Sequence, residues 1–403
     1  MNNPVIILGL STPGIFLLRH FLKKGIKAYG LECNPKELGF KSRFGIKQVC
    51  PDPENNGEKF LEFILKMRKD FDVNPVLIPT ADKFVLPLND YADELSGYFY
   101  FTMPKDGILR KLTSKRYCYE LAIKYGYPAP VTCFVRDGSG LENFVKNVEF
   151  PCILKPEFPE SWRSGFLEEF CNGEKVIIVN SADELFSKYN VIKKYDDRVI
   201  VQEIIQGDDS NLHYFISYLD KNQNCIGSFT GIKERIAPVH FGSASYVDLV
   251  YNRELEEMTV KWLKDMKFWG ISGVEVKKDI RDNIYKLIEV NPRFGLWDEI
   301  GNKFGIDVAM MSYNELLGKP SVPVKVTKTN IRWISIHRDI RASAEYVSKG
   351  IIPFHKIMKS YFRFPIYVGD MRLNDLGLTF YLIKNLIKGI FKRIFKKKKK
   401  NNV

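Results

Sequence analysis

The first apolar segment of the chain restricts the fold most. Pro4 to Leu10 is a continuous apolar run, which is typical of a strand buried on both faces of a parallel sheet. Helical and strand patterns then alternate. We expect helices at 15–24, about 58–69 and about 83–95, and strands at 26–31 and 76–78. This βαβα order predicts an open, doubly wound α/β domain over roughly the first hundred residues.

A short loop from Gly9 to Gly14 joins the first strand to the first helix. A dinucleotide-binding loop has the pattern GxGxxG, whereas this loop contains only its two terminal glycines. We therefore interpret the glycines as requirements of a tight strand-to-helix turn, with an NAD-binding protein as a less favoured alternative.

The character of the sequence changes at about Asp106. A helical pattern from Ser114 to Tyr125 ends at Gly126 to Pro130, and a second helix is expected from Glu254 to Met266. Short β-rich segments lie at 131–135, 152–155, 175–179, 199–202 and 212–218. We expect an N-terminal domain (1–105), a second domain (106–320, with a subdomain at about 131–203), an extension (321–370) and a tail (371–403).

Two neighbouring strands carry the strongest chemical pattern. Because side chains alternate across a strand, Glu289 and Asn291 share one face of the strand from Tyr285 to Arg293. Glu275 occupies the corresponding position of the strand before it. Two carboxylates in a partly buried place require a cation, and Mg²⁺ prefers such oxygen ligands. Solvated carboxylates on the outer face of a sheet are the alternative.

Three further features favour a nucleotide site. Arg293 directly follows the carboxylate face and is placed to contact a phosphate. Lys155 ends a short apolar strand, where it can act as a point charge for phosphates or simply extend to solvent. The strand beginning at Val199 leads into Gly207, Asp208 and Asp209, an arrangement that suits adenine and ribose or merely a polar turn.

In this order, the features resemble the ATP-grasp superfamily, which includes D-alanine and D-aspartate ligases, biotin carboxylase and carbamoyl-phosphate synthetase. The resemblance covers roughly residues 110 to 318 and implies two α+β subdomains that clasp ATP, preceded by a Rossmann-like pre-ATP-grasp domain. The matching elements are 112–115, 126–130, 151–156, 201–209, Glu275 and 289–293.

The resemblance also implies roles for individual residues. The nucleotide-binding lysines would be Lys115, Lys155 and, with a less direct match, Lys175. The adenine hinge would be Gln202, Glu203 and Ile205, and the ribose acid Asp209. Two Mg²⁺ ions, or Mn²⁺ in their place, would be held by Glu275, Glu289 and Asn291, with Arg293 and Lys155 as the catalytic cations.

The sequence departs from the family pattern in the loop that closes over ATP. This loop is normally rich in glycine, but residues 157–165 are bulky and contain only Gly165. Lys233, Arg235 and the turn at 242–245 lie where contacts to a carboxylate or phosphate would fit. A basic strand edge and an ordinary turn explain them equally well.

The resemblance implies an ADP-forming ligase that activates a carboxylate as an acyl phosphate and joins it to an amine. An ATP-binding regulator without turnover and a carboxylase subunit similar to biotin carboxylase are the alternatives. The five histidines and seven cysteines form no recognisable ligand or disulfide pattern. Scattered cysteines and the absence of a basic leader predict a cytoplasmic protein.

The basic charge is concentrated in the tail. Nine of the 13 net positive charges lie beyond Asp375, so we expect no nucleic-acid partner. These nine are Lys384, Lys388, Lys392, Arg393 and Lys396–Lys400. An apolar stripe accompanies them at Leu376, Phe380, Ile383, Ile387, Ile390 and Ile394. The pattern predicts an interfacial helix on the inner face of an anionic membrane, and a helix docked on its own domain is the alternative. Membrane contact would suit a ligase acting on cell-envelope or lipid-linked glycan precursors.

Overall fold

The computed structural model describes residues 2–104, 107–135, 140–157, 159–162, 165–173, 176–240, 242–319, 321–327 and 329–400, with the backbone alone for 159, 160 and 390–400. The chain divides into two compact units. Unit 1 comprises Met1–Arg110, Tyr214–Gly273 and Asn291–Val403, and unit 2 comprises Lys111–His213 and Val274–Val290. The strands β9 (Leu212–Leu219), β12 (Gly270–Lys278) and β13 (Tyr285–Asn291) carry the chain between them.

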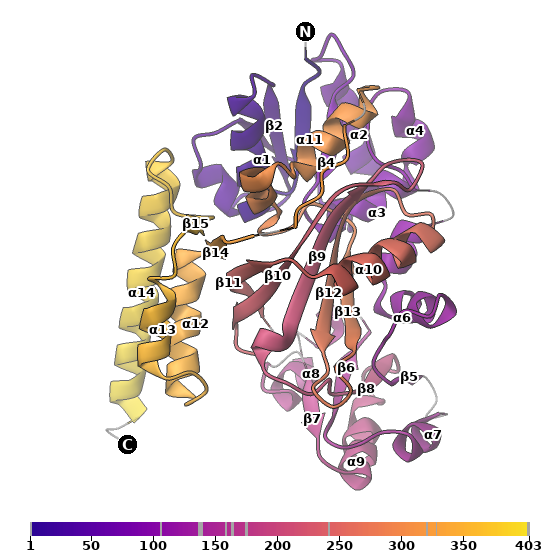
Figure 1. Ribbon diagram of the computed structural model, residues 1–403, viewed down its shortest axis with the longest axis vertical. Helices are drawn as coiled ribbons and strands as arrows, with labels where there is room; N and C mark the ends of the chain where they lie inside the picture. The colour runs from indigo at the N-terminus through magenta and orange to yellow at the C-terminus, as the bar shows by residue number, and fades with distance from the viewer. Residues whose placement is uncertain are drawn as a thin grey trace. The chain divides into compact units, whose positions relative to one another are not determined.

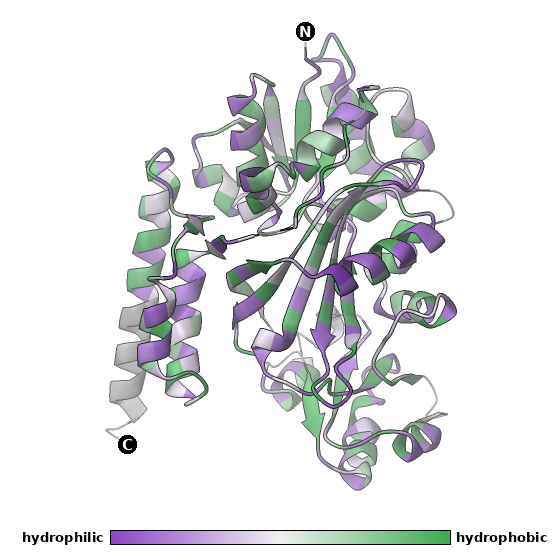
Figure 2. Cartoon of the chain, viewed as in Figure 1, coloured by the Kyte–Doolittle hydropathy of each residue, from purple (hydrophilic) through white to green (hydrophobic). Residues whose placement is uncertain are grey.

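Unit 1 begins with the expected doubly wound domain (Figure 1). Its parallel sheet has the order β3-β2-β1-β4. The strands are β1 (Val5–Leu8), β2 (Ala28–Glu32), β3 (Ile46–Val49) and β4 (Val76–Pro79), and the helices are α1 (Thr12–Lys23), η1 (Leu38–Lys41), α2 (Gly57–Arg68), α3 (Asp82–Asp90) and α4 (Ala92–Ser96). All four side chains of β1 are fully buried, which confirms the interpretation of the apolar run; the strand is uniformly hydrophobic in Figure 2.

The helix expected at about 83–95 is two helices, α3 and α4, which meet at Tyr91. Pro87 lies inside α3 and has no N–H to donate to the preceding turn. The loop after β1 behaves as a tight turn. Gly9 has a φ of +100°, and a Cβ at Gly14 would lie 2.0 Å from the Gly9 carbonyl oxygen. Only glycine fits both positions.

A seven-stranded sheet has the order β13-β12-β9-β10-β11-β14-β15. Its strands within unit 1 are β10 (Cys225–Ala237), β11 (Ser243–Val250), β14 (Arg332–Ile334) and β15 (Ile366–Val368). β11 pairs antiparallel with β10 and β14, whereas β14 and β15 are parallel. The other helices of unit 1 are α10 (Arg253–Asp265), η4 (Asp298–Phe304), α11 (Val308–Leu316), α12 (Ile336–Ser348), α13 (Phe354–Ser360) and α14 (Leu376–Lys400). The short helix α5 (Ile108–Thr113) lies at the boundary between the units.

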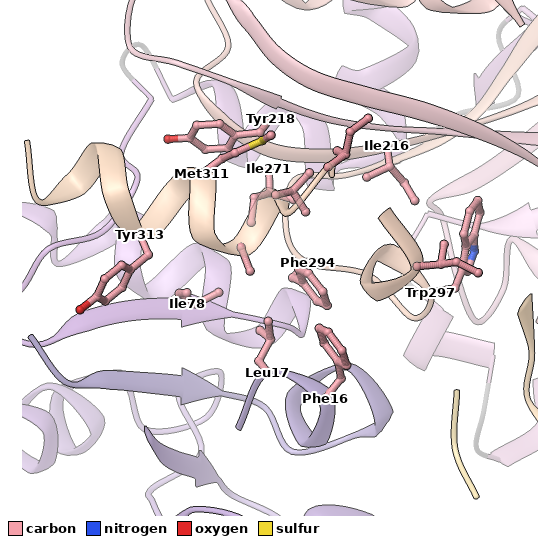
Figure 3. Close-up of a cluster of buried hydrophobic side chains, with 14 of the residues drawn as sticks. Phe16, Leu17, Ile78, Ile216, Tyr218, Ile271, Phe294, Trp297, Met311 and Tyr313 are labelled. Atoms are coloured by element: carbon pink, nitrogen blue, oxygen red, sulfur yellow. The ribbon is translucent and has the colours of Figure 1, made fainter. Parts of the chain in front are cut away.

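One hydrophobic core joins the first domain to the rest of unit 1 (Figure 3). The rings of Phe16 on α1 and Phe294 stack with their centroids 5.8 Å apart. Phe294 directly follows Arg293, so the loop after β13 is anchored on the N-terminal domain by apolar packing.

Unit 2 contains a four-stranded antiparallel sheet with the order β5-β8-β6-β7. The strands are β5 (Thr132–Val135), β6 (Cys152–Pro156), β7 (Ile177–Val179) and β8 (Val199–Glu203). Its helices are α6 (Lys115–Lys124), α7 (Leu141–Lys146), η2 (Pro159–Trp162), α8 (Gly165–Phe170), α9 (Ala182–Ile192) and η3 (Asp209–Asn211). These strands confirm the short β segments expected from the sequence, and their inner faces bury a separate core.

Within the described residues, no helix combines the length and the apolar composition that crossing a bilayer demands. The seven cysteines are all free thiols.

Candidate active site

The sheet of unit 2 places a lysine against an amide. Lys155 on β6 donates a 2.7 Å hydrogen bond to the Oε1 atom of Gln202 on β8, and the Nε2 atom of Gln202 donates to the Thr132 hydroxyl. The pKa of Lys155 is lowered to about 7, mainly by burial and also by the nearby charge of Lys115, while Glu289 opposes the shift. Two neighbouring lysines, one of them poorly solvated, form a place where a bound anion would relieve their repulsion.

Tyr119 on α6 connects this pair to the carboxylates. Its hydroxyl donates to the Ile288 carbonyl on β13 at 3.0 Å, and its ring lies 5.5 Å from the Lys155 ammonium. Burial raises the pKa of Tyr119, and the negative charges of Glu289 and Glu275 add to this effect. Both glutamates therefore lie within electrostatic reach of one tyrosine. Unit 2 thus brings together Lys115, Lys155, Glu275 and Glu289.

The strands that carry the carboxylates are built as expected. Val274 and Val276 are fully buried, and the Glu275 side chain between them is 8% exposed. The turn between β12 and β13 closes with hydrogen bonds from the Asp279 and Asn283 amides. On β13, Glu289 and Asn291 are two residues apart and share one face. In the described residues, no three side chains of His, Cys, Asp or Glu form a metal-binding group. The magnesium ligands expected from the sequence are of a different kind, because they comprise two glutamates and the amide of Asn291.

The hinge after β8 carries a charged network that the sequence did not reveal. Glu203 is 7% exposed, and its carboxylate accepts from the Val131 amide (3.0 Å), the Arg281 guanidinium (2.9 Å) and the Lys286 ammonium (3.3 Å). Arg281 and Lys286 also bind Asp279, which is fully buried. The Glu203 side chain is therefore fully engaged by partners inside unit 2.

Ile205 and Asp209 lie beyond this strand, and both are buried. Gly207 has a φ of +121°, so the turn between them requires glycine. Asp208 and Asp209 attract the ammonium of Lys277 on β12, and burial lowers the pKa of that lysine. The sequence interpretation did not include Lys277, although it lies on the same face of β12 as Glu275.

Arg293 belongs to unit 1, where Asp82 at the start of α3 binds its guanidinium at 2.7 and 2.9 Å. Arg293 also donates to the Asn291 Oδ1 atom at 2.9 Å. Five residues further on, Asp298 is 1% exposed and accepts from the Gly295 amide at 2.6 Å. Burial raises the pKa of Asp298 to about 7. No local motif distinguishes Asp82 or Asp298 from an ordinary acidic residue at the start of a helix, so neither could be recognised from the sequence.

Two residues considered as ligand contacts have partners inside unit 1. Arg235 is 2% exposed, and its guanidinium binds both oxygens of Asp339 at 2.9 and 2.8 Å. Ser245 donates to the same carboxylate. The Lys233 ammonium lies 5.1 Å from the centre of the Tyr214 ring. Arg235 therefore has a structural ion pair, because its charge is satisfied by the chain itself.

The loop expected to cover ATP is described in part. Trp162 is buried in the core of unit 2 and donates to Asp196. Lys175, Phe158, Arg163 and Ser164 lie outside the described residues, so the nucleotide-binding role expected for Lys175 stays a prediction.

Comparison with known proteins agrees with the fold and with the resemblance. Residues 168–295 match the ATP-grasp domain family. The D-aspartate ligase of Enterococcus faecium (strain Aus0004) is 26% identical over 277 residues, which cover 65% of each chain and hence less than two thirds of that enzyme.

Two solved structures show the same fold. One is the biotin carboxylase domain of the 2-oxoglutarate carboxylase of Hydrogenobacter thermophilus in complex with MgADP, ADP and bicarbonate, at 15% identity and a TM-score of 0.59 over 80% of this chain and 72% of that chain. The other is the L-amino acid ligase from Bacillus licheniformis, at 14% identity and a TM-score of 0.54 over 78% of this chain and 74% of that chain. A central segment of the chain therefore matches the ATP-grasp domain family, and the fold is shared with both solved structures.

Proposed function

We propose that the protein is an ATP- and Mg²⁺-dependent ligase that activates a carboxylate as an acyl phosphate and joins it to an amine, releasing ADP and phosphate. The observation that carries this proposal is the convergence in unit 2 of Lys155 with Glu289 and of both glutamates with Tyr119. A buried ammonium group near two carboxylates suits the binding of a nucleoside triphosphate together with a metal ion. The similarity to a D-aspartate ligase supports an amino acid as one of the two substrates.

We assign the binding of ATP to residues of unit 2. Lys115 and Lys155 would hold the phosphates, because their mutual repulsion falls when an anion binds. The main chain at Gln202, Glu203 and Ile205 would contact adenine. Asp209 would accept from a ribose hydroxyl, in the orientation that the neighbouring Lys277 favours.

Magnesium fits the donor set of Glu275, Glu289 and Asn291, because carboxylate and amide oxygens are its preferred protein ligands. When bound, two Mg²⁺ ions, or Mn²⁺ in their place, would neutralise charge on the phosphates. Arg293 would contact the transferred phosphate. Its guanidinium is already oriented by Asp82 and Asn291, so little conformational freedom would be lost on binding.

We further propose that the ligase works in the cytoplasm at the inner face of the membrane, on precursors of the cell envelope or of lipid-linked glycans. The substrates would be an amino acid or sugar acid and an amine. The basic, apolar tail and the similarity to a D-aspartate ligase support this setting.

Trapping of the acyl phosphate with hydroxylamine tests the activity. Purified protein receives Mg-ATP and pools of amino acids, including D- and L-aspartate, and of sugar acids. The expected result is a hydroxamate with one pool that requires Mg²⁺ and falls at least about a hundredfold in Glu289→Gln. Glu149→Gln is the matched control, because this glutamate is exposed and, among the described residues, its carboxylate pairs with Arg281 at 3.5 Å.

Three other outcomes contradict the proposal in different ways. ATP binding with no hydroxamate from any pool would favour a regulator without turnover. ADP formation that requires bicarbonate and biotin would favour a carboxylase subunit. Absence of ATP binding would exclude a nucleotide site at Lys155.

A further inference from the structure

The C-terminal helix α14 is part of the folded unit 1. Leu378 and Leu382 are each 3% exposed and pack with Ile15 of α1. Asp375, just before the helix, is fully buried and accepts from the Ser42 hydroxyl and the Arg43 amide. α14 also packs against η1 and α12. The docked helix that the sequence left as an alternative is therefore present.

The other side of this helix exposes large apolar side chains. The exposed fractions are 52% for Leu376, 65% for Phe380, 37% for Ile383 and 47% for Ile387. At roughly 100° per residue these four lie within an arc of about 60°, on the side of the helix away from Leu378 and Leu382. We call these four residues the apolar face of α14. Figure 2 shows hydrophobic residues interspersed with hydrophilic ones along the described part of the helix.

Positive charge borders this apolar face. Lys384 and Lys388 are exposed and lie about 40° and 80° around the helix from Phe380. Seven further lysines and arginines occur in the sequence beyond Gly389, and no acidic residue follows Asp375. An apolar face with a strongly basic border is complementary to a bilayer that contains anionic lipids.

The stretch of sequence that leads into α14 is also rich in exposed aromatic residues. Among the described residues, five phenylalanines are strongly exposed, and four of them lie between residues 354 and 380. They are Phe354, Phe362, Phe364 and Phe380. Exposed aromatic rings beside lysines are typical of surfaces that enter the interface of a membrane.

We propose that the apolar face of α14 is a preformed binding surface for anionic phospholipid membranes. A disordered tail would have to fold on the bilayer, whereas this helix is already held by its docked side and presents its apolar face without ordering. A second copy of the chain fits less well, because two such faces would bring their lysine borders together in a symmetric dimer. The inference deepens and rests on the membrane setting proposed above, but it does not depend on the ligase activity.

Flotation with lipid vesicles tests the surface with the full-length protein. The vesicles contain phosphatidylcholine alone or equal parts of phosphatidylcholine and phosphatidylglycerol. The expected result is binding to the anionic vesicles, weakened by salt. The double variant Phe380→Asp/Ile387→Asp should reduce the partition coefficient at least about tenfold, and Lys384→Gln/Lys388→Gln about 30-fold. Ile123→Asp is the matched control, because Ile123 is 73% exposed on α6, in unit 2.

Circular dichroism on the same samples tests whether the surface is preformed, and the expected helix content is the same with and without vesicles. The inference would be overturned by a gain of helix on binding or by absence of vesicle binding. It would also be overturned by binding that survives the Phe380→Asp/Ile387→Asp change. Concentration-dependent dimers that this change abolishes, without vesicle binding, would identify a second copy as the partner. Hydroxamate formation in vesicle-free buffer reports on the proposed ligase activity separately.

Discussion

The guanidinium of Arg293 binds both carboxylate oxygens of Asp82, at 2.7 and 2.9 Å, although the two residues are 211 positions apart. Asp82 begins α3 of the N-terminal domain, and Arg293 follows the strand that carries Glu289. A two-point, charge-assisted contact fixes the plane of the guanidinium as well as its position. In unit 1, the N-terminal domain therefore orients the guanidinium of Arg293, which we propose contacts the transferred phosphate.

Asp82→Asn tests this orientation. We expect kcat to fall roughly tenfold, because the guanidinium is no longer held by an anion, while the Kd for ATP changes less than about twofold. The Asp82 side chain is 53% exposed, so stability should change by less than about 1 kcal/mol. Steady-state kinetics and nucleotide titration measure both effects. Asp90→Asn, which removes an exposed partner of Arg110, is the control, and an unchanged kcat in Asp82→Asn would exclude a positioning role.

Lys155 predicts a pH dependence of ATP binding. Burial holds its pKa at about 7 in the free protein, and bound phosphates should raise this pKa toward the ordinary value of 10.5. Below pH 7 the lysine is already charged, so binding takes up no proton there. Above pH 7 binding must take up a proton, and affinity should fall by up to about tenfold per pH unit until the pKa of the bound state is reached.

Calorimetric titrations of ATP at pH 8 in buffers of different ionisation enthalpy measure this proton uptake. Lys155→Arg is the matched variant, because a guanidinium stays charged over this range and should abolish the uptake whatever affinity remains. Equal binding enthalpies for the wild-type protein in all buffers would mean that Lys155 does not contact the phosphates.

The Arg235–Asp339 pair predicts a large effect on stability. Both side chains are almost fully buried, so Asp339→Asn leaves a buried guanidinium without its counterion. We expect the free energy of unfolding to fall by about 3–5 kcal/mol in urea titrations. Asp265→Asn, which breaks the exposed pair with Lys261, should cost less than about 0.5 kcal/mol. A small loss of stability in Asp339→Asn would leave Arg235 as a candidate ligand contact.

The local pattern of the sequence predicted the elements of the fold well. The apolar run at 4–10, the helix ending at Gly126 and the paired strands around Glu275 and Glu289 all lie where expected. Each has a periodicity or a stop signal that can be read within a few residues. β14 and β15 have three residues each, too few to show a period, and the sequence did not place them.

The sequence by itself determined most of the order of strands and helices and the resemblance to the ATP-grasp superfamily. It also indicated the residues that we propose to bind ATP and magnesium, because these patterns depend on neighbours along the chain. Only the tertiary structure decided which charges meet. In the sequence, Asp82 resembles any acidic residue at the start of a helix. Its role became visible only because packing places it beside Arg293. The sequence of the tail likewise predicted an apolar stripe along a helix, but it did not predict what that helix packs against. Packing against Ile15 buries Leu378 and Leu382 and leaves Phe380 exposed, because a helix can dock only one of its faces.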